Sequence, residues 1–207
     1  MTPKIVDKEQ RRLEIALAAL EVFAREGFET TSISQIAKAI GIGKGTVYEY
    51  FPSKEALIGA AARAWVASLE AGISPHLDAT LDPEAQLRSL FEATTRSFLE
   101  APHLVRLFLE VLQVGLRNPA LQSQLGGPRE ISRPVRDAIE AILRRGVEQG
   151  VFLPEVVARA PALAINMVAF VDGLGMHYIA SPGFFDLHAQ VDLYLEGVLS
   201  GLRTPSR

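Results

Sequence analysis

The side chains best suited to binding a polyanion lie on one face of a short predicted helix over residues 44–51. Val47 and Phe51 stand four residues apart, and they therefore turn to the same, inward face of that helix. The residues that the 3.6-residue period then directs outward are Gly45, Thr46 and Glu49, with Lys44, Tyr48 and Tyr50 beside them. One cation, several hydroxyls and a small central residue suit a DNA major groove, where side chains reach base edges and the flanking phosphates.

A second short helix must hold this one at a steep angle, and the preceding residues predict it. Ser32 is placed to cap that helix, with Gln35 reaching back in a capping box. Ala37 is small enough to let the two helices cross closely, and Gly41 supplies the left-handed conformation that a sharp turn requires. Together these residues predict a helix-turn-helix at about residues 34–53.

Within this helix-turn-helix we assign two kinds of DNA contact by residue chemistry. The residues expected at phosphates are Ser32, Tyr50 and Lys54, and those expected at base edges or beside them are Lys44, Gly45, Thr46, Tyr48 and Glu49. Any one of these features is also typical of three ordinary packed helices. Their joint occurrence at these spacings favours DNA binding.

The segment resembles the DNA-binding domain of the TetR family of transcriptional regulators over about the first 60 residues. The residues that carry the resemblance are Phe23, Gly27, Phe28, Thr31, Ile36, Ala37, Gly41, Lys44, Gly45, Thr46, Val47, Tyr48, Tyr50, Phe51, Ser53, Lys54 and Leu57. Gly43 departs from the pattern, because the family often has Ser at this position. The resemblance implies a dimeric repressor that a small ligand releases from DNA, with its recognition helix at residues 44–51.

Composition predicts a soluble protein with its basic residues gathered toward one end. The chain has 207 residues, is 48% hydrophobic and carries a net charge of -3. Residues 1–65 hold 9 basic against 8 acidic side chains, whereas the remainder holds 12 against 16, as expected of a DNA-binding head on an acidic body. The N-terminus lacks an apolar signal core, and the charge-free run Ala160–Val171 in the body is too short to span a bilayer. We therefore expect a cytoplasmic location without membrane insertion.

The sequence lacks the patterns of a catalytic or metal site. Cysteine is absent, and the four histidines have no partner at ligand spacing. The Gly-rich run Gly41–Thr46 does not have the Gly-Lys-Ser/Thr order of a phosphate-binding loop, and a helix rather than a strand precedes it. We therefore expect no enzyme activity, no metal and no cofactor.

The apolar periodicity is helical throughout, so the predicted fold class is all-α. We expect a TetR-type DNA-binding domain with three helices at residues 1–65, joined to a larger helical domain at 66–207 that binds the effector and forms the dimer. In the first helix, from about Asp7, the apolar face is expected at Leu13, Ala16, Leu17, Leu20, Phe23 and Ala24. Further helices are expected at about 53–72, 82–100, 102–116, 119–125, 129–149, 157–180 and 184–201. The remaining expectations are a loose N-terminal arm with Lys4, and breaks at Ser74-Pro75 and at 126–128.

The last two predicted helices are too apolar to be solvated on an outer face. Gly173, Gly197 and Gly201 would let another backbone approach closely. A two-fold dimer through these helices would also supply two DNA half-sites. We therefore expect a homodimer, while the alternative is that the apolar face is buried within one subunit.

Aromatic residues mixed with isolated polar groups in the body predict a pocket for a small, mainly apolar effector. The expected lining is Phe91, Thr94, Phe98, Phe108, Gln113, Asn166, Phe170 and His177. Taken singly, most of these are typical of an ordinary core, where a polar group such as the Asn166 amide bonds to a backbone carbonyl. The chain is interpreted as a ligand-responsive regulator, a repressor on a palindromic double-stranded operator. The alternatives are a constitutive or architectural DNA-binding protein without an effector, and a small helical enzyme.

Overall fold

A computed structural model describes residues 8–73, 80–125 and 132–205, and it divides the chain into two compact units. The head unit contains the described residues of 1–68 and 103–131, and the body unit contains those of 69–102 and 132–207. Three sequence expectations lie outside the described residues: the arm with Lys4, the break at Ser74-Pro75 and the break at 126–128. Each unit is described by itself below.

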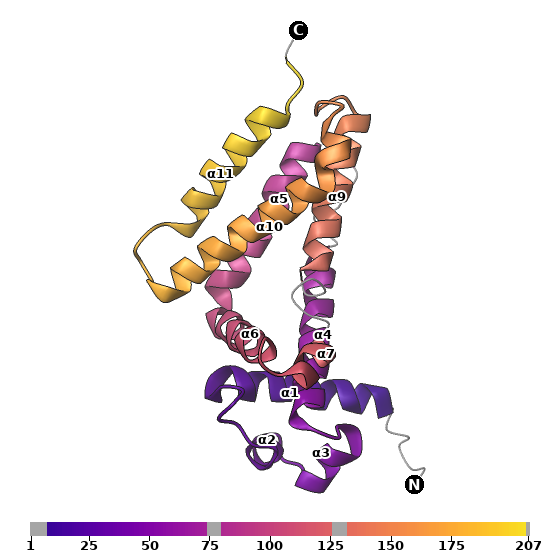
Figure 1. Ribbon diagram of the computed structural model, residues 1–207, viewed down its shortest axis with the longest axis vertical. Helices are drawn as coiled ribbons and strands as arrows, with labels where there is room; N and C mark the ends of the chain where they lie inside the picture. Colours follow the sequence, from indigo (N-terminus) through magenta and orange to yellow (C-terminus); the bar gives the residue numbers. More distant parts are fainter. Residues whose placement is uncertain (1–7, 74–79, 126–131, 206–207) are drawn as a thin grey trace. The chain divides into compact units, whose positions relative to one another are not determined.

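The head unit combines the long helices α1 (Lys8–Glu26) and α4 (Lys54–Ile73, which continues beyond Ser68) with the shorter α2 (Ile33–Ala39), α3 (Lys44–Tyr50), α6 (Pro102–Gly115) and α7 (Pro119–Leu125) (Figure 1). Asn118 starts α7, because its side-chain oxygen accepts from the Leu121 amide at 3.1 Å. The all-α expectation is confirmed for this unit, since the described residues hold no strand here.

The core of the head unit joins the helix-turn-helix to two helices from later in the chain. Phe23, Phe51 and Leu57 are fully buried, and Leu107 of α6 and Leu121 of α7 pack into the same cluster. The predicted boundary at residue 65 therefore differs from the observed units, because the apolar faces of α6 and α7 are buried against the head. Burial of this kind is decided by tertiary contacts and leaves no mark at a domain boundary in the sequence.

The apolar face of α1 is rotated from the expected one. Leu13 and Leu17 are 42% and 41% exposed, so the expectation that they lie in the core is wrong. The buried side chains of α1 are instead Ile15, Ala16, Ala19, Leu20, Val22 and Phe23. An α1 face centred on these residues can pack against α2 and α6 together, and this two-sided burial selects a face that periodicity alone does not distinguish.

The body unit consists of α5 (Pro83–Glu100), α9 (Arg133–Glu148), α10 (Val156–Ala180) and α11 (Leu187–Leu202). In Figure 1, α10 crosses α9 and runs on to the corner from which α11 returns beside it. Asp82 caps α5 through its Oδ2, which accepts from the amides of Glu84 and Ala85 at 3.0 and 3.2 Å. The expected start of α11 at Phe184 is wrong, because Asp186 caps the helix by accepting from the Ala189 amide at 3.1 Å.

The end of α11 is tied to the corner between α9 and α10. Leu153 donates its amide to the Leu202 carbonyl at 2.8 Å, and Thr204 donates to the Val151 carbonyl at 3.1 Å. Phe152 is buried beneath this pairing, with its ring against the Gly146 backbone. Arg203 then reaches α5, where its Nη2 lies 2.7 Å from the Glu84 carboxylate. Contacts between residues far apart in the sequence therefore hold the end of α11 against α5 and against the corner between α9 and α10.

By length and composition alone, the 25-residue α10 could cross a bilayer. The charge-free run Ala160–Val171 within this helix did not indicate this, because that run is shorter than the helix. The core helix of a soluble protein meets the same criterion, and α10 packs against α9, α11 and α5 of its own chain. We therefore assign α10 to the body unit.

Candidate DNA interface and effector site

The turn between α2 and α3 has the geometry that the sequence predicts. Gly41 has a φ of 72°, in the left-handed region, and follows the last residues of α2. The Ile42 amide donates to the Ala37 carbonyl at 3.0 Å and the Gly41 amide donates to the Lys38 carbonyl at 3.3 Å. This pair of bonds is the Schellman motif, which ends a helix and turns the chain sharply. It fixes the direction in which α3 leaves the turn.

Most of the predicted outward face of α3 is solvent-accessible, with Thr46 as the exception among its central residues. Val47 and Phe51 are fully buried, which turns the opposite side of the helix outward. The residues of the predicted strip that are exposed are Lys44, Gly45, Tyr48 and Glu49, whereas Thr46 and Tyr50 are half-buried. The Lys44 ammonium lies 5.8 Å from the centre of the Tyr48 ring, and both groups remain accessible to a partner. Gly43 caps α3 without a side-chain bond.

Ser32 forms the predicted capping box at the start of α2. Its Oγ accepts from the Gln35 amide at 3.3 Å, while the Gln35 Oε1 accepts from the Ser32 amide at 2.8 Å. The Ser32 hydroxyl also donates to the Gln35 Oε1 at 2.6 Å. A phosphate accepts hydrogen bonds only, so contact with this hydroxyl would have to replace its bond to Gln35.

Lys54 has a structural role that the sequence did not indicate. Its ammonium donates to the backbone carbonyls of Phe28, Glu29 and Thr31 at 2.8, 3.2 and 3.0 Å. The same group lies 4.6 Å from the centre of the Phe28 ring. All three of its N–H groups are therefore directed at the loop between α1 and α2. The expected phosphate contact by Lys54 would compete with these bonds.

The same loop is held by a residue of α6. Glu110 accepts a hydrogen bond from the Glu29 backbone amide, with 3.1 Å between the nitrogen and Oε1. These two residues are 81 positions apart, so no local pattern in the sequence could have found the contact. Glu110 was not among the expected site residues, although a charged residue between buried Leu107 and Val111 was a weak signal of a specific contact.

Four residues of the expected effector lining belong to α5 and α10 in the body unit and lie in or near its core. Phe91 and Phe98 are buried, and the Phe98 ring lies so close to α10 that a Cβ at Gly175 would stand 2.4 Å from it. Thr94 is half-buried and donates its hydroxyl to the Leu90 carbonyl of its own helix at 2.9 Å. Phe170 stacks on Tyr194 of α11 with 3.7 Å between ring centroids.

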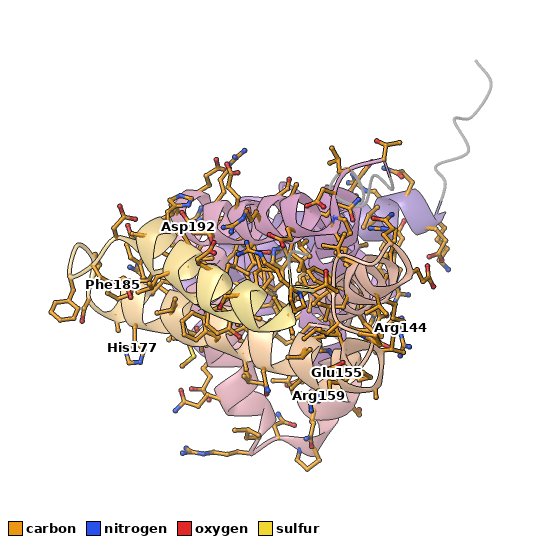
Figure 2. All side chains as sticks on the ribbon, turned by 90° about the horizontal axis from the view of Figure 1, so that it is seen from above. Arg144, Glu155, Arg159, His177, Phe185 and Asp192 are labelled. Atoms are coloured by element: carbon orange, nitrogen blue, oxygen red, sulfur yellow. The ribbon has the colours of Figure 1, made fainter. Side chains whose placement is uncertain are left out.

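The other four expected lining residues are not in that core. Asn166 and His177 are exposed on α10, and Figure 2 shows His177 projecting outward. Phe108 and Gln113 belong to the head unit, where Phe108 packs against Trp65 with ring centroids 5.8 Å apart and Gln113 is exposed. The body unit therefore brings together only part of the expected set.

The faces of α10 and α11 carry exposed apolar side chains next to glycines with open space. Ile165 and Met176 of α10 are 52% and 49% exposed, and Leu193 of α11 is 70% exposed. A Cβ at Gly197 or Gly201 would meet no atom within 4 Å, and the same holds at Gly173. Exposed apolar groups gathered on neighbouring helices are typical of an interaction surface.

An acidic residue interrupts this apolar face. Asp172 of α10 is exposed in the single chain, although desolvation by the surrounding protein atoms raises the pKa of its carboxyl from 3.8 to about 6. Its side chain still keeps contact with solvent in the single chain. The sequence indicated only that Asp172 ends a charge-free run, and it did not single out the residue.

The described residues show no cluster of three or more His, Asp or Glu side chains that could hold a metal ion. In the body unit, Arg88, Glu84, Glu196 and Arg203 form an ion network between helices. Hydrogen bonds from Arg203 lower the pKa of Glu84, and those from Arg88 and Arg203 lower the pKa of Glu196. These ion pairs link α5, α11 and the residue that follows α11.

Comparisons with known proteins extend over nearly the whole chain. A family model described as bacterial regulatory proteins, tetR family, matches residues 15–61, and one for the C-terminal part of BetI-type transcriptional repressors matches residues 83–202. The chain is 25% identical over 209 residues to the HTH-type transcriptional repressor KstR2 of Rhodococcus jostii, which covers 99% of each protein.

Solved structures share the fold. The regulator FadR of Bacillus subtilis, in complex with stearoyl-CoA, matches with a TM-score of 0.73 and 22% identity over 91% of this chain and 98% of that one. A regulator of Saccharomonospora viridis in complex with choline matches with a TM-score of 0.77 and 22% identity over 95% and 100% of the two chains. At these identities the likeness establishes the architecture.

Proposed function

The chain belongs to the TetR family of transcriptional regulators, and we propose that it is a dimeric repressor whose α3 reads a palindromic operator and which a small, mainly apolar effector releases from DNA. The family match covers the helix-turn-helix and most of the remaining chain. Operator, effector and dimer are our inferences for this chain. The proposed place of action is the cytoplasm, where the DNA is.

The exposed strip on α3 is the observation that supports DNA reading most directly. Lys44, Tyr48 and Glu49 stand clear of the core, and the Schellman turn before them fixes their direction. Lys44 is a donor for phosphate or guanine, and the Glu49 carboxylate can accept from a cytosine amino group. Gly45 has nothing within 4 Å of its missing side chain, which leaves room for close approach of a groove wall.

The apolar faces of α10 and α11 support a homodimer through these helices. Ile165, Met176 and Leu193 would leave water on association, which is favourable by about 25 cal/mol for each Å² of apolar surface buried. A two-fold axis between these faces would present two copies of α3 to the DNA. The preferred operator is then a palindrome with half-sites about one helical turn, or a multiple of it, apart.

Selection from a random pool of double-stranded DNA tests the operator. We expect an enriched palindrome, and the Glu49→Ala variant should change which base is preferred at one position in each half-site. Uniformly tighter binding to all sequences would show that Glu49 only repels phosphate. A pool without enrichment would favour the architectural alternative, in which DNA is bound with little sequence preference.

Sedimentation of the DNA-free protein tests the dimer. Gly197→Leu should convert it to monomers, because the open space at Gly197 would be occupied. Ala141→Leu, on the exposed side of α9, is the control and should leave the dimer intact. A Gly197→Leu protein that stays dimeric with full DNA affinity would place the interface elsewhere.

The effector is proposed to contact the aromatic part of the body unit around Phe91 and Phe98. Two proteins of this fold bind very different ligands: stearoyl-CoA, which has a long acyl chain, and choline, which is a small cation. These two compounds are therefore suitable first probes. We expect stearoyl-CoA, through its apolar acyl chain, to raise Tm and to lower operator affinity by about 5- to 150-fold, and Phe98→Ala to reduce this effect. If a wider hydrophobic screen also leaves Tm and operator release unchanged, the constitutive alternative is favoured. Product formation from any probe would favour the small helical enzyme.

A further inference from the structure

The loop between α1 and α2, residues 27–32, is held from two sides by charged side chains. Lys54 of α4 donates to three of its carbonyls, at 2.8 to 3.2 Å. Glu110 of α6 accepts from its Glu29 amide at 3.1 Å. Within the loop, the buried Thr31 donates its hydroxyl to the Gly27 carbonyl at 2.6 Å. The loop is therefore fixed by side chains rather than by a regular ladder of backbone bonds.

The place of Glu110 is determined by the packing of α6. Leu107 and Val111 stand three residues before and one after it, and both are buried in the core of the head unit. The carboxylate lies beside Gly27, where a Cβ would stand 3.4 Å from each Glu110 oxygen, which is ordinary van der Waals contact. Glu110 is thus a half-buried group with a defined partner.

The loop that Glu110 holds determines where α2 begins. Only Thr30 and Thr31 separate the Glu29 amide from Ser32, which caps α2. In addition, α6 follows α5 of the body unit after a single residue, Ala101. Glu110 therefore joins the first segment of chain that leaves α5 to the loop that positions the helix-turn-helix.

From these contacts we propose that Glu110 is a positioning residue for DNA binding: through the Glu29 amide it holds α2, and with it α3, in the orientation that fits the operator. The inference rests on the proposed function, because it requires that the head unit binds DNA. It gives α6 a second role in the head unit: in addition to the apolar packing of Leu107 and Val111, α6 holds the loop before α2 by a hydrogen bond.

Substitution of Glu110 should change DNA affinity in opposite directions, depending on whether the residue positions the loop or only repels phosphate. A carboxylate in a DNA-binding head repels phosphate, so removing its charge alone should tighten binding in any variant. Loss of positioning should weaken binding, and only in the variant that loses the acceptor. Glu110→Gln keeps an acceptor oxygen at nearly the same place, whereas Glu110→Ala removes it.

The experiment compares these two variants with the wild type on a DNA fragment selected by the wild-type protein. Glu110→Ala should weaken binding about tenfold, which is the scale of one hydrogen bond to a charged group. Glu110→Gln should bind within about threefold of the wild type, since its amide oxygen can still accept from Glu29. Glu148→Ala, at the end of α9 in the body unit, removes the same charge and is the matched control.

Hydrogen exchange of the 27–32 segment supplies a second readout that does not require DNA. Exchange at the Glu29 amide should be faster in Glu110→Ala than in the other three proteins, without a general loss of protection in α1 or α3.

Two results would overturn the inference: Glu110→Ala binding as tightly as the wild type or more tightly, or equal weakening by Glu110→Ala and Glu110→Gln. If the wild type selects no DNA, the proposed function fails and the positioning role falls with it. If the wild type binds and Glu110→Ala binds equally well, the positioning role alone is wrong.

Discussion

The head and body units use their charged and apolar side chains in opposite ways. In the head, Lys54 and Glu110 are directed at the backbone of one internal loop, and the outward face of α3 is polar and exposed. In the body, Arg203 pairs with Glu84 of α5 and with Glu196 of α11, and apolar residues such as Leu193 remain exposed on α10 and α11. The α3 face is compatible with water until DNA binds, whereas the face of α10 and α11 gains free energy when a partner covers it.

This difference indicates which kind of change should affect which unit. Function in the head depends on the direction of a few side chains, so small substitutions there should alter DNA binding more than stability. The body depends on close packing between distant segments, so overpacking there should alter stability first. Four substitutions test this division, from the largest expected free-energy change to the smallest.

Gly146→Ala should have the largest effect and should act on the body. The added methyl carbon would stand 2.1 Å from a ring carbon of Phe152, which is buried and cannot move into solvent. We expect a loss of about 2 kcal/mol in the free energy of unfolding, within the usual range for an overpacked core. Thermal unfolding measures it. An unchanged Tm would show that the corner between α9 and α10 repacks freely.

Lys44→Ala should act on DNA binding while leaving stability unchanged. Loss of one phosphate contact per half-site should lower affinity for all sequences and reduce the salt dependence by about one unit of slope per contact. If Lys44 reads guanine instead, specificity should relax at one base pair. The control is Arg159→Ala, which removes the same charge from an exposed position on α10 (Figure 2). Equal effects of the two substitutions would remove Lys44 from the interface.

Asp172→Asn should stabilise the body in a pH-dependent way. Because the folded pKa of this carboxyl is raised from 3.8 to about 6, ionisation in the folded chain costs stability as pH rises. The amide avoids that cost, so the gain should be full above pH 6 and should decline toward zero as pH falls to 3.8. We expect about 1 kcal/mol at pH 7.5, since solvent contact reduces the effect. A gain independent of pH would exclude titration as its cause.

Gly45→Ala should have the smallest effect of the four. It should slightly raise the stability of the folded chain and weaken its binding to the operator. Glycine inside a helix costs about 1 kcal/mol relative to alanine, and nothing within 4 Å of Gly45 explains it in the free protein. The substitution should therefore raise Tm slightly and weaken operator binding, because a methyl group enters the face that meets DNA. Unchanged operator affinity would show that Gly45 is away from the groove.

Local patterns in the sequence determined the head most fully. The capping box at Ser32, the left-handed Gly41 and the inward Val47 and Phe51 all rest on interactions within a few residues, and the structure confirms each of them. The helix start at Asp82 and the all-α class follow from the same short-range signals. The roles of single residues at DNA and the dimer face stay predictions.

The tertiary structure alone decided which faces are buried and which charges meet. Leu13 and Leu17 follow a helical period but stay exposed, because α1 turns another face toward its neighbours. The membership of α6 in the head, the contact of Glu110 with the Glu29 amide and that of Arg203 with Glu84 join residues that are far apart in the chain. Periodicity and capping carry information over about one or two helical turns, whereas such contacts depend on how whole helices pack.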